Sequence, residues 1–276
     1  MATKTALVTG ASSGIGEATA RKLRDLGYTV YGAGRRTDRL ERLAVAGIHP
    51  LTMDLTEDES ASSGVKTIIA ETGGIDVLVN NAGYGSYGAL EDVPLSEARR
   101  QFEVNVFGAV RLTQLVLPHM RAQRSGTIVN VTSMGGKIYT PLGGWYHSTK
   151  FALEALSDCL RLEAGPFGVR VVVVEPGGIR TEWAGVAAHN LKRSSSTGAY
   201  ARQAEAMVAM LGSETVNRRS SPPSVVADAI GRAVTTRRPK TRYVTGFGAR
   251  PLLLMRHLLP DRAFDALIAR VSGVPI

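Results

Sequence analysis

The chain has 276 residues, 44% of them hydrophobic and 21% charged, an ordinary globular composition with enough length for one sizeable core. Mean hydropathy is +0.00 and apolar runs stay short of the about 18 residues that a membrane span needs, which excludes a disordered and a membrane-spanning chain. Cys159 is the only cysteine, which excludes an intramolecular disulfide and a cysteine-rich metal site and fits a reducing compartment.

The formal charge of +9 is unevenly distributed along the chain. Residues 1–184 hold equal numbers of basic and acidic side chains, whereas residues 185–276 hold 14 basic and 5 acidic ones and so carry the whole excess. A solvated face, nucleic acid, an anionic membrane surface and an acidic carrier protein are all compatible with such a region. Because the arginines are scattered and no aromatic residues interleave with them, we expect no nucleic acid, and a peripheral membrane contact stays open.

The first two-thirds of the chain repeat a short apolar, β-branched run, a turn and a segment of helical period. This alternation predicts an α/β fold, a doubly wound parallel sheet of the Rossmann type with helices on both faces. Residues 171–174 are four consecutive valines, as is typical of a strand covered on both sides. The predicted strands are 6–9, 29–33, 49–53, 77–80, 127–131 and 169–175, and the predicted helices lie near 14–27, 37–46, 58–72, 96–123 and 146–165.

The pattern loosens after Pro176. The elements predicted here are a mobile loop at 189–198, a helix at 224–235, a seventh strand at 242–245 and two short amphipathic helices within 251–271. We therefore predict one domain at 1–248, with a substrate loop at about 179–221, and a helical C-terminal extension of the same domain at 249–276.

A glycine-rich turn, Gly10-Ala11-Ser12-Ser13-Gly14-Ile15-Gly16, separates the first predicted strand from the first predicted helix. Glycines at these spacings let the backbone turn tightly, admit a pyrophosphate against bare N–H groups and let the helix pack close to the sheet. The helix N-terminus adds a partial positive charge. The turn therefore predicts a dinucleotide site.

Two arginines, Arg35 and Arg36, follow the second predicted strand, where the adenine ribose of a dinucleotide is expected. An acidic residue at this place selects the 2′-hydroxyl of NAD, whereas guanidinium groups suit the 2′-phosphate of NADP. Ion pairs of these arginines with Asp38 and Glu41 are the alternative. The sequence favours NADP over NAD.

A set of polar residues follows the later strands. Tyr146 and Lys150 are four residues apart at the start of a predicted helix and share one face. An ammonium beside a phenol lowers the phenol pKa from about 10, so that the tyrosine can exchange a proton with an alcohol or carbonyl oxygen. Ser133 follows the fifth strand at the ligand-binding edge of the sheet. Asn105 lies in an otherwise apolar helical stretch, and a buried asparagine needs partners.

Taken together, these motifs resemble those of the short-chain dehydrogenase/reductase family, in its single-domain branch. The resemblance covers roughly residues 3–185. The matching motifs, in order, are Thr9 to Gly16, Asn80-Asn81-Ala82-Gly83, Asn105, Ser133, Tyr146-His147-Ser148-Thr149-Lys150 and Pro176-Gly177.

The resemblance implies a role for each catalytic residue. Tyr146 is implied to be the general acid/base, with Lys150 lowering its pKa and holding the nicotinamide ribose. Ser133 is implied to orient the substrate oxygen, and Asn105 to anchor a water that relays protons to Lys150. Asn80 is expected to brace the central strands.

The same resemblance implies a cofactor site built from several segments. Ser13 stands where many NADP-dependent members carry a basic residue, so recognition of the 2′-phosphate depends on Arg35 and Arg36. The other implied contacts are the turn residues Gly10, Ser12, Ser13, Gly14, Ile15 and Gly16, Asp54 and Leu55 at the adenine, Asn81, Ala82 and Gly83 at the adenosine ribose, and Pro176, Gly177, Ile179 and Thr181 at the nicotinamide.

Other candidate residues are assigned lesser roles. Cys159 is interpreted as a small core residue, His147 as a supporting residue behind Tyr146, and the scattered histidines and carboxylates predict no metal site. Candidate pocket walls, with core packing as the alternative, are Gly85, Tyr87, Tyr139, Leu142, Trp145 and Trp183.

The sequence thus predicts an NADP(H)-dependent oxidoreductase that acts on a secondary alcohol or ketone, with the looser similarity pointing to hydroxysteroid and retinol dehydrogenases and so to a lipophilic substrate. A 3-oxoacyl thioester reductase and a catalytically silent NADP-binding sensor or scaffold are the alternatives. The resemblance also implies a homodimer or homotetramer through helices 96–123 and 146–165. The apolar stretch at the N-terminus is too short for a secretory signal, so a cytoplasmic protein is expected.

Overall fold

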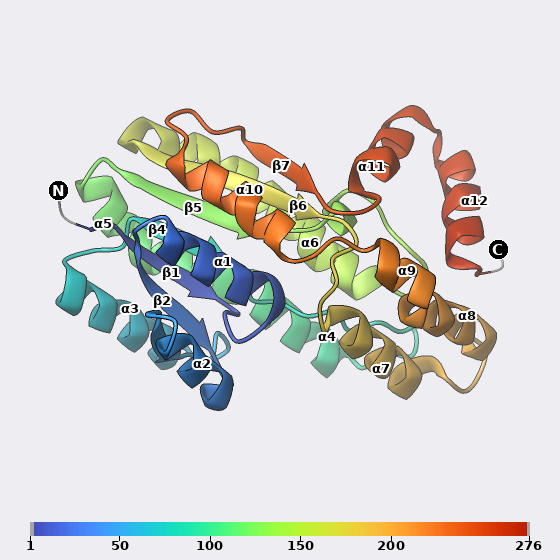
Figure 1. The fold of residues 1–276 in the computed structure, drawn as a ribbon. Helices are drawn as coiled ribbons and strands as arrows, with labels where there is room; N and C mark the ends of the chain where they lie inside the picture. Colours follow the sequence, from blue (N-terminus) through green and yellow to red (C-terminus); the bar gives the residue numbers. More distant parts are fainter. Residues whose placement is uncertain (1–2, 275–276) are drawn as a thin grey trace.

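The computed structural model describes residues 3–274, which form a parallel sheet between two layers of helices (Figure 1). Residues 1–2 and 275–276, the outer ends of the predicted units 1–248 and 249–276, lie outside the described residues. The strands of the described part are β1 (Thr5–Thr9), β2 (Thr29–Gly34), β3 (His49–Thr52), β4 (Val77–Asn80), β5 (Gly126–Val131), β6 (Val169–Pro176) and β7 (Arg242–Thr245). They confirm all seven predicted strands.

The strand order places the ligand-binding edge of the sheet. The order is β3-β2-β1-β4-β5-β6-β7, and each neighbouring pair is parallel. Because the chain winds outward in one direction from β1 and in the other from β4, a crevice opens beyond the carboxyl ends of these two strands. The sheet thus places its switch point directly after Thr9 and Asn80.

Apolar residues on both faces of the sheet anchor the two helical layers. Leu23, Leu40 and Ile230 are fully buried on one face, and Ile68 and Leu112 on the other. Burying one such side chain stabilises the fold by about 1.5–3 kcal/mol. Helices α1 (Gly14–Asp25), α2 (Thr37–Ala44) and α10 (Ser224–Thr235) cover the first face, and α3 (Asp58–Thr72), α5 (Gly108–Ala122) and α6 (Gly144–Ala164) cover the second.

The helix predicted over 96–123 contains an irregularity that its sequence pattern does not reveal. It divides into α4 (Leu95–Phe102), a π-helical turn at Glu103–Phe107, and α5. A π-turn often marks a functional position in a helix because it re-aims the side chains that it carries. This one carries Asn105, which is buried.

The predicted mobile loop at 189–198 is wrong, because residues up to Ser195 belong to helix α7 (Trp183–Ser195). Ala187 and Leu191 are one turn apart and fully buried, and the Ser195 hydroxyl accepts a hydrogen bond of 3.0 Å from the Ala89 N–H. The polar residues that suggested a loop are the exposed face of the helix. Helices α8 (Ala201–Gly212) and α9 (Glu214–Arg219) follow, so most of the region predicted as a substrate loop is helical.

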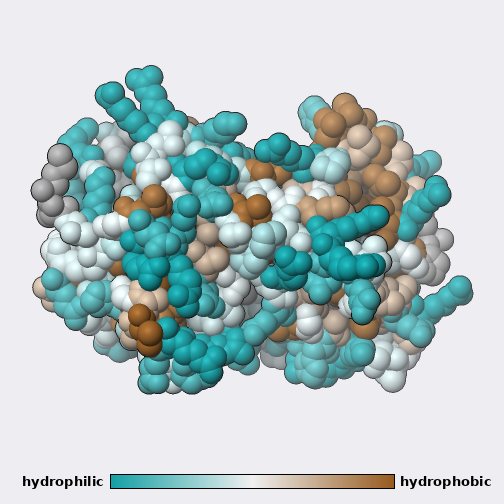
Figure 2. Space-filling model, viewed as in Figure 1, coloured by the Kyte–Doolittle hydropathy of each residue, from teal (hydrophilic) through white to brown (hydrophobic). Residues whose placement is uncertain are grey.

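The two predicted C-terminal helices are present as α11 (Ala249–Leu258) and α12 (Asp261–Ser272). Phe264 of α12 is fully buried against Ile138, in a cluster that also includes α11 residues. The outer side of α11 exposes Leu254 and Leu258, and Figure 2 shows apolar residues gathered at this end of the molecule. Among the described residues, none of the helices combines the length and the apolar character that crossing a membrane requires.

Candidate active site

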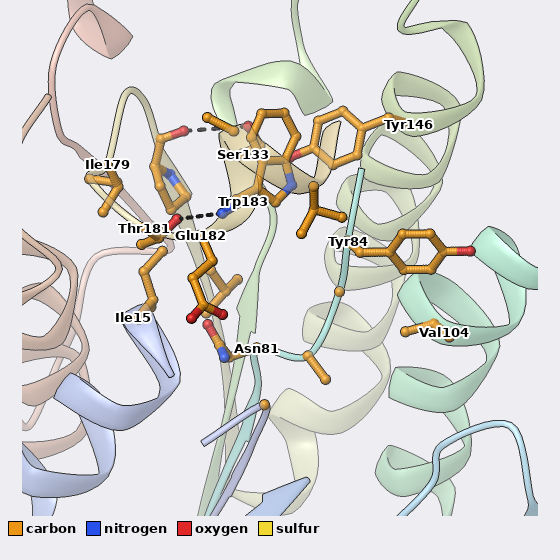
Figure 3. Close-up of a pocket in the computed structure, with 18 of the residues that line it drawn as sticks. Ile15, Asn81, Tyr84, Val104, Ser133, Tyr146, Ile179, Thr181, Glu182 and Trp183 are labelled. Atoms are coloured by element: carbon orange, nitrogen blue, oxygen red, sulfur yellow. Dashed lines mark hydrogen bonds between the residues drawn. The ribbon is translucent and has the colours of Figure 1, made fainter. Parts of the chain in front are cut away.

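A cavity of about 760 Å³ opens at the carboxyl edge of the sheet, between the glycine-rich turn and α7. Figure 3 shows side chains from segments far apart in the sequence, from Ile15 to Trp183, converging on it. Almost all the residues predicted for cofactor binding and catalysis line this cavity. Gly16 and Asn105 instead lie in the layer behind it, against Gly10 and Tyr84.

The glycine-rich turn leaves room that larger residues would fill. Gly10 has a φ of +67°, and a Cβ atom there would lie 2.9 Å from Asn81 Nδ2. A Cβ atom on Gly16 would lie 2.2 Å from the Gly10 carbonyl oxygen. Because α1 begins directly after Ser13, its free N–H groups face the cavity edge. This cradle fits a dinucleotide pyrophosphate.

Thr9 ties the turn to the loop after β4, a role that the sequence did not reveal. Its hydroxyl accepts hydrogen bonds of 3.0 Å from both the Asn81 and Ala82 N–H groups. Asn81 Nδ2 returns a bond of 2.8 Å to the Thr9 carbonyl oxygen. The predicted pyrophosphate and ribose segments are therefore held in one rigid unit.

Arg35 and Arg36 point to different partners. Arg35 Nη1 lies 3.8 Å from Asp54 Oδ2, at the predicted adenine end. Arg36 donates to the Ser12 and Ser13 hydroxyls and pairs with Glu182 at 3.0 Å. Arg36 therefore pairs with Glu182 and not with Asp38 or Glu41, the alternative partners suggested by the sequence. Its partner Glu182 is 146 positions away in the sequence, which is why no local pattern predicted it.

The predicted catalytic side chains lie together at the other end of the cavity. Ser133 lies two residues beyond β5, and its hydroxyl accepts a 3.0 Å bond from the Gly135 N–H. Tyr146 and Lys150 lie on successive turns of α6. Figure 3 shows the Tyr146 side chain directed toward Ser133. A serine hydroxyl and a phenol thus face the same space, as proton exchange at one substrate oxygen requires.

The expected lowering of the Tyr146 pKa by Lys150 is not found in this structure. Burial raises the pKa of Tyr146 to about 12, and a hydrogen bond with Ser133 partly opposes the rise. Lys150 Nζ donates 3.0 Å to the Val131 carbonyl oxygen and lies 6.0 Å from the Tyr146 ring centroid. Burial lowers the pKa of Lys150 itself to about 8. Desolvation therefore determines the direction of the pKa shift of both side chains.

Asn105 has the partners that a buried asparagine needs. Its Oδ1 accepts a bond of 3.0 Å from the Tyr84 N–H, and its Nδ2 donates to Tyr84 O at 3.0 Å and to Thr149 Oγ1 at 3.1 Å. These bonds connect the loop after β4 to α6, one residue from Lys150. The water-anchoring role of Asn105 stays a prediction.

Several supporting residues lie where they were expected. Asn80 braces β4 against β5 with a bond of 2.9 Å to Asn130 Oδ1. His147 is buried and bonds Gly135 O and Thr140 with its two ring nitrogens. Cys159, by contrast, is exposed on α6 and is not a core residue.

The predicted pocket walls divide between the cavity and the core. Tyr87 and Trp183 line the cavity and contact each other edge to face, with ring centroids 5.8 Å apart. Gly85 lies against the Trp183 ring, Trp145 packs on Phe102, Tyr139 on Phe264, and Leu142 belongs to the apolar cluster under α7. Three further wall residues on α8 and α9 were not predicted from the sequence: Met210, Leu211 and Val216. The helical spacing of apolar residues in this segment could have indicated them.

An ionic cluster around two buried carboxylates, Glu154 and Glu175, lies behind the catalytic end of the cavity. Arg242 of β7 donates to Glu154 Oε2 at 2.9 Å and to Asp158 Oδ2 at 2.7 Å, and its Nε lies 3.5 Å from Glu175 Oε1. Glu154 also accepts a 2.6 Å bond from the hydroxyl of Thr132, the neighbour of Ser133. Burial and the adjacent Glu154 raise the pKa of Glu175 to about 7. Arg242 is the main cause that lowers the pKa of Asp158 to about 2.

This combination of a doubly wound sheet, a glycine-rich turn at its switch point and a serine, tyrosine and lysine in one cavity defines a dinucleotide-dependent oxidoreductase. A family model described as short chain dehydrogenase matches residues 4–192. The chain belongs to the short-chain dehydrogenase/reductase family, as its motifs implied, and it is an NAD(P)-dependent enzyme.

Relatives and solved structures agree over nearly the whole chain. A 3-ketodihydrosphingosine reductase of Bacteroides thetaiotaomicron is 36% identical over 241 residues, covering 87% of each chain. An NADPH-dependent 3-dehydrocapnine reductase of Ornithobacterium rhinotracheale is 34% identical over 273 residues, covering 95% of each. The crystal structure of a short-chain dehydrogenase from Streptomyces avermitilis matches with a TM-score of 0.78 at 34% identity, over 98% of this chain and 97% of that one.

Proposed function

We propose that the protein is an NADP(H)-dependent reductase of a lipophilic ketone, and that it oxidises the matching secondary alcohol in the reverse direction. The observation that carries the proposal is one continuous cavity. It joins Ser133, Tyr146 and Lys150 at the sheet edge to an aromatic and apolar wall that includes Tyr87 and Trp183.

The side chains at the sheet edge supply the proton chemistry. When bound, the nicotinamide supplies the hydride for the carbonyl carbon. The Ser133 and Tyr146 hydroxyls hold the carbonyl oxygen, and the Tyr146 O–H donates the proton that completes the alcohol. Because the pKa of Tyr146 is about 12, the phenol is protonated at neutral pH and ready for reduction. Lys150 lines the same cavity as Tyr146 and would hold the nicotinamide ribose there.

The apolar part of the cavity supports a lipophilic substrate. Met134 and Ile138 line the cavity and also pack against the α11–α12 pair, so the substrate wall continues into an apolar cluster. Two relatives are named as reductases of 3-ketodihydrosphingosine and of 3-dehydrocapnine. A long-chain amino ketone therefore joins steroid and retinoid carbonyls as a candidate substrate.

The substrate class is tested by following NADPH consumption with a panel of carbonyl compounds. The panel contains 3-ketodihydrosphingosine, steroid ketones, a retinal-like aldehyde, 3-oxoacyl thioesters and small ketones. We expect turnover with a lipophilic ketone and slow turnover with small ones, because only the former fills the apolar wall. Turnover confined to 3-oxoacyl thioesters would replace the proposal with the thioester alternative. NADPH binding without any turnover would support a sensor or scaffold.

If Arg35 and Arg36 bind the 2′-phosphate, replacing them should weaken the binding of NADPH much more than the binding of NADH. The double variant Arg35→Ala/Arg36→Ala should weaken NADPH binding by about 10- to 100-fold, because charge-assisted bonds to the 2′-phosphate are lost. NADH lacks that phosphate, so its dissociation constant should change by less than about threefold. Fluorescence titration of each cofactor measures both values. Equal weakening of the two cofactors would refute a 2′-phosphate site at these arginines.

A further inference from the structure

A carboxylate from the substrate-binding part of the chain lies on the guanidinium groups at the adenosine end of the cavity. Glu182 Oε2 is 3.0 Å from Arg36 Nη1, and Glu182 Oε1 is 2.6 Å from Arg39 Nη1. Arg36 also donates to the hydroxyls of Ser12 at 3.0 Å and Ser13 at 2.6 Å. Two guanidinium groups therefore form an anion site that Glu182 occupies, and the two hydroxyls hold the Arg36 guanidinium in place.

Glu182 is ionised there, because Arg39 and Arg36 hold its pKa below the ordinary value. It also directly precedes Trp183, the first residue of α7. The Trp183 ring lies 5.0 Å from the Tyr146 ring, between centroids, and forms part of the substrate wall. Figure 3 shows Glu182 and Trp183 at adjoining places on the cavity lining. One short segment thus touches both the anion site and the substrate pocket.

We infer that Glu182 is an internal competitor of the cofactor 2′-phosphate, and that binding of NADP(H) displaces its carboxylate from Arg36 and Arg39. The inference relies on the NADP(H) preference proposed above. A phosphate on Arg36 brings further negative charge next to Glu182, and like charges that share one guanidinium repel. NADH carries no 2′-phosphate and leaves the Glu182 contacts intact. Glu182 therefore reduces the selectivity for NADP(H) over NAD(H) that Arg36 provides. Because Glu182 is adjacent to Trp183, its displacement also couples cofactor binding to the position of the Trp183 ring.

The test measures equilibrium binding by calorimetry, with adenosine 2′,5′-bisphosphate, adenosine 5′-phosphate, NADPH and NADH as ligands. Glu182→Gln keeps the shape of the side chain but removes its charge. It should tighten the bisphosphate and NADPH about fivefold, the scale of one partly exposed ion pair, and leave the two unphosphorylated ligands within about twofold. Glu163→Gln removes a matched exposed carboxylate at the far end of α6 and should change none of the four constants.

The outcomes separate the two proposals. If wild-type protein binds adenosine 2′,5′-bisphosphate no tighter than adenosine 5′-phosphate, the NADP(H) preference fails and the role of Glu182 fails with it. If the wild type discriminates but Glu182→Gln leaves the bisphosphate unchanged or weakens it, only the inference about Glu182 is overturned. Selective tightening of the phosphorylated ligands supports both.

Tryptophan fluorescence provides a second readout, since Trp145 and Trp183 are the only tryptophans. In a Trp145→Phe background, adenosine 2′,5′-bisphosphate should change the Trp183 emission, because release of Glu182 moves its neighbour. The change should be much smaller when Glu182→Gln is added, because that variant has already lost the ion pairs. An equal change in both backgrounds would overturn the link to the substrate wall.

Discussion

Replacing Tyr146 with phenylalanine should lower kcat by about 100- to 10,000-fold, the usual range for loss of a general acid. The substitution removes one oxygen from a ring that is buried against Tyr87 and Trp183, so packing and the fold should persist. The affinity for NADPH should stay within about threefold, because most predicted cofactor contacts lie elsewhere along the cavity. Steady-state kinetics and fluorescence titration of the same preparation measure the two effects.

Tyr84→Phe is the matched control for this experiment. Tyr84 lines the same cavity, but its hydroxyl donates 3.0 Å to Glu97 Oε1, away from Ser133. Its loss should therefore leave kcat within about threefold of wild type. If Tyr146→Phe retains most of the activity, the proton that completes the alcohol does not come from Tyr146. If the Tyr84 variant is equally impaired, the loss is not specific to the Tyr146 hydroxyl.

The sequence predicts the sheet well because each of its strands has a local signal. The four valines at 171–174 are apolar at consecutive positions, and β6 is buried along nearly its whole length. Ser133, Tyr146 and the glycine-rich turn were found for a related reason: each follows a strand or starts a helix, and parallel topology brings such positions to one edge. Local pattern and global fold agree in this part of the chain.

Features that depend on distant partners escaped prediction. Residues 189–198 look like a loop because most of their side chains are polar. Burial of Leu191 and the hydrogen bond between Ser195 and Ala89 nevertheless hold the segment up to Ser195 in α7. The pairing of Arg36 with Glu182 spans 146 positions and follows only from the folded cavity. The raised pKa of Tyr146 likewise reflects burial, which no spacing of residues reveals.

Arg242 should be among the most important residues for stability, although it lies outside the cavity lining. It is the closest cation to Glu154 and Glu175, whose side chains are 7% and 1% exposed. Arg242→Met should destabilise the fold by about 3 kcal/mol, the lower end for breaking a buried ion pair, because Lys137 Nζ still lies 3.7 Å from Glu154 and 3.8 Å from Glu175. Thermal unfolding followed by circular dichroism should show a Tm lower by about 5–10 °C. Arg238→Met, an exposed arginine that precedes β7, should have little effect.

The stability that Arg242→Met loses should also depend on pH and should increase as the pH rises. In the native state the pKa of Glu175 is already raised to about 7, above its ordinary 4.5, so its contribution to stability falls as pH rises through this interval. Removing Arg242 raises that pKa further and also removes the main partner that stabilises ionised Asp158. The destabilisation should therefore be larger at about pH 8 than at about pH 5, where the Glu175 carboxyl is protonated and needs no cation; Asp158 is ionised at both pH values and adds an equal loss to each. A deficit that is equal at both pH values, or larger in acid, would mean that Arg242 does not stabilise the fold through Glu175.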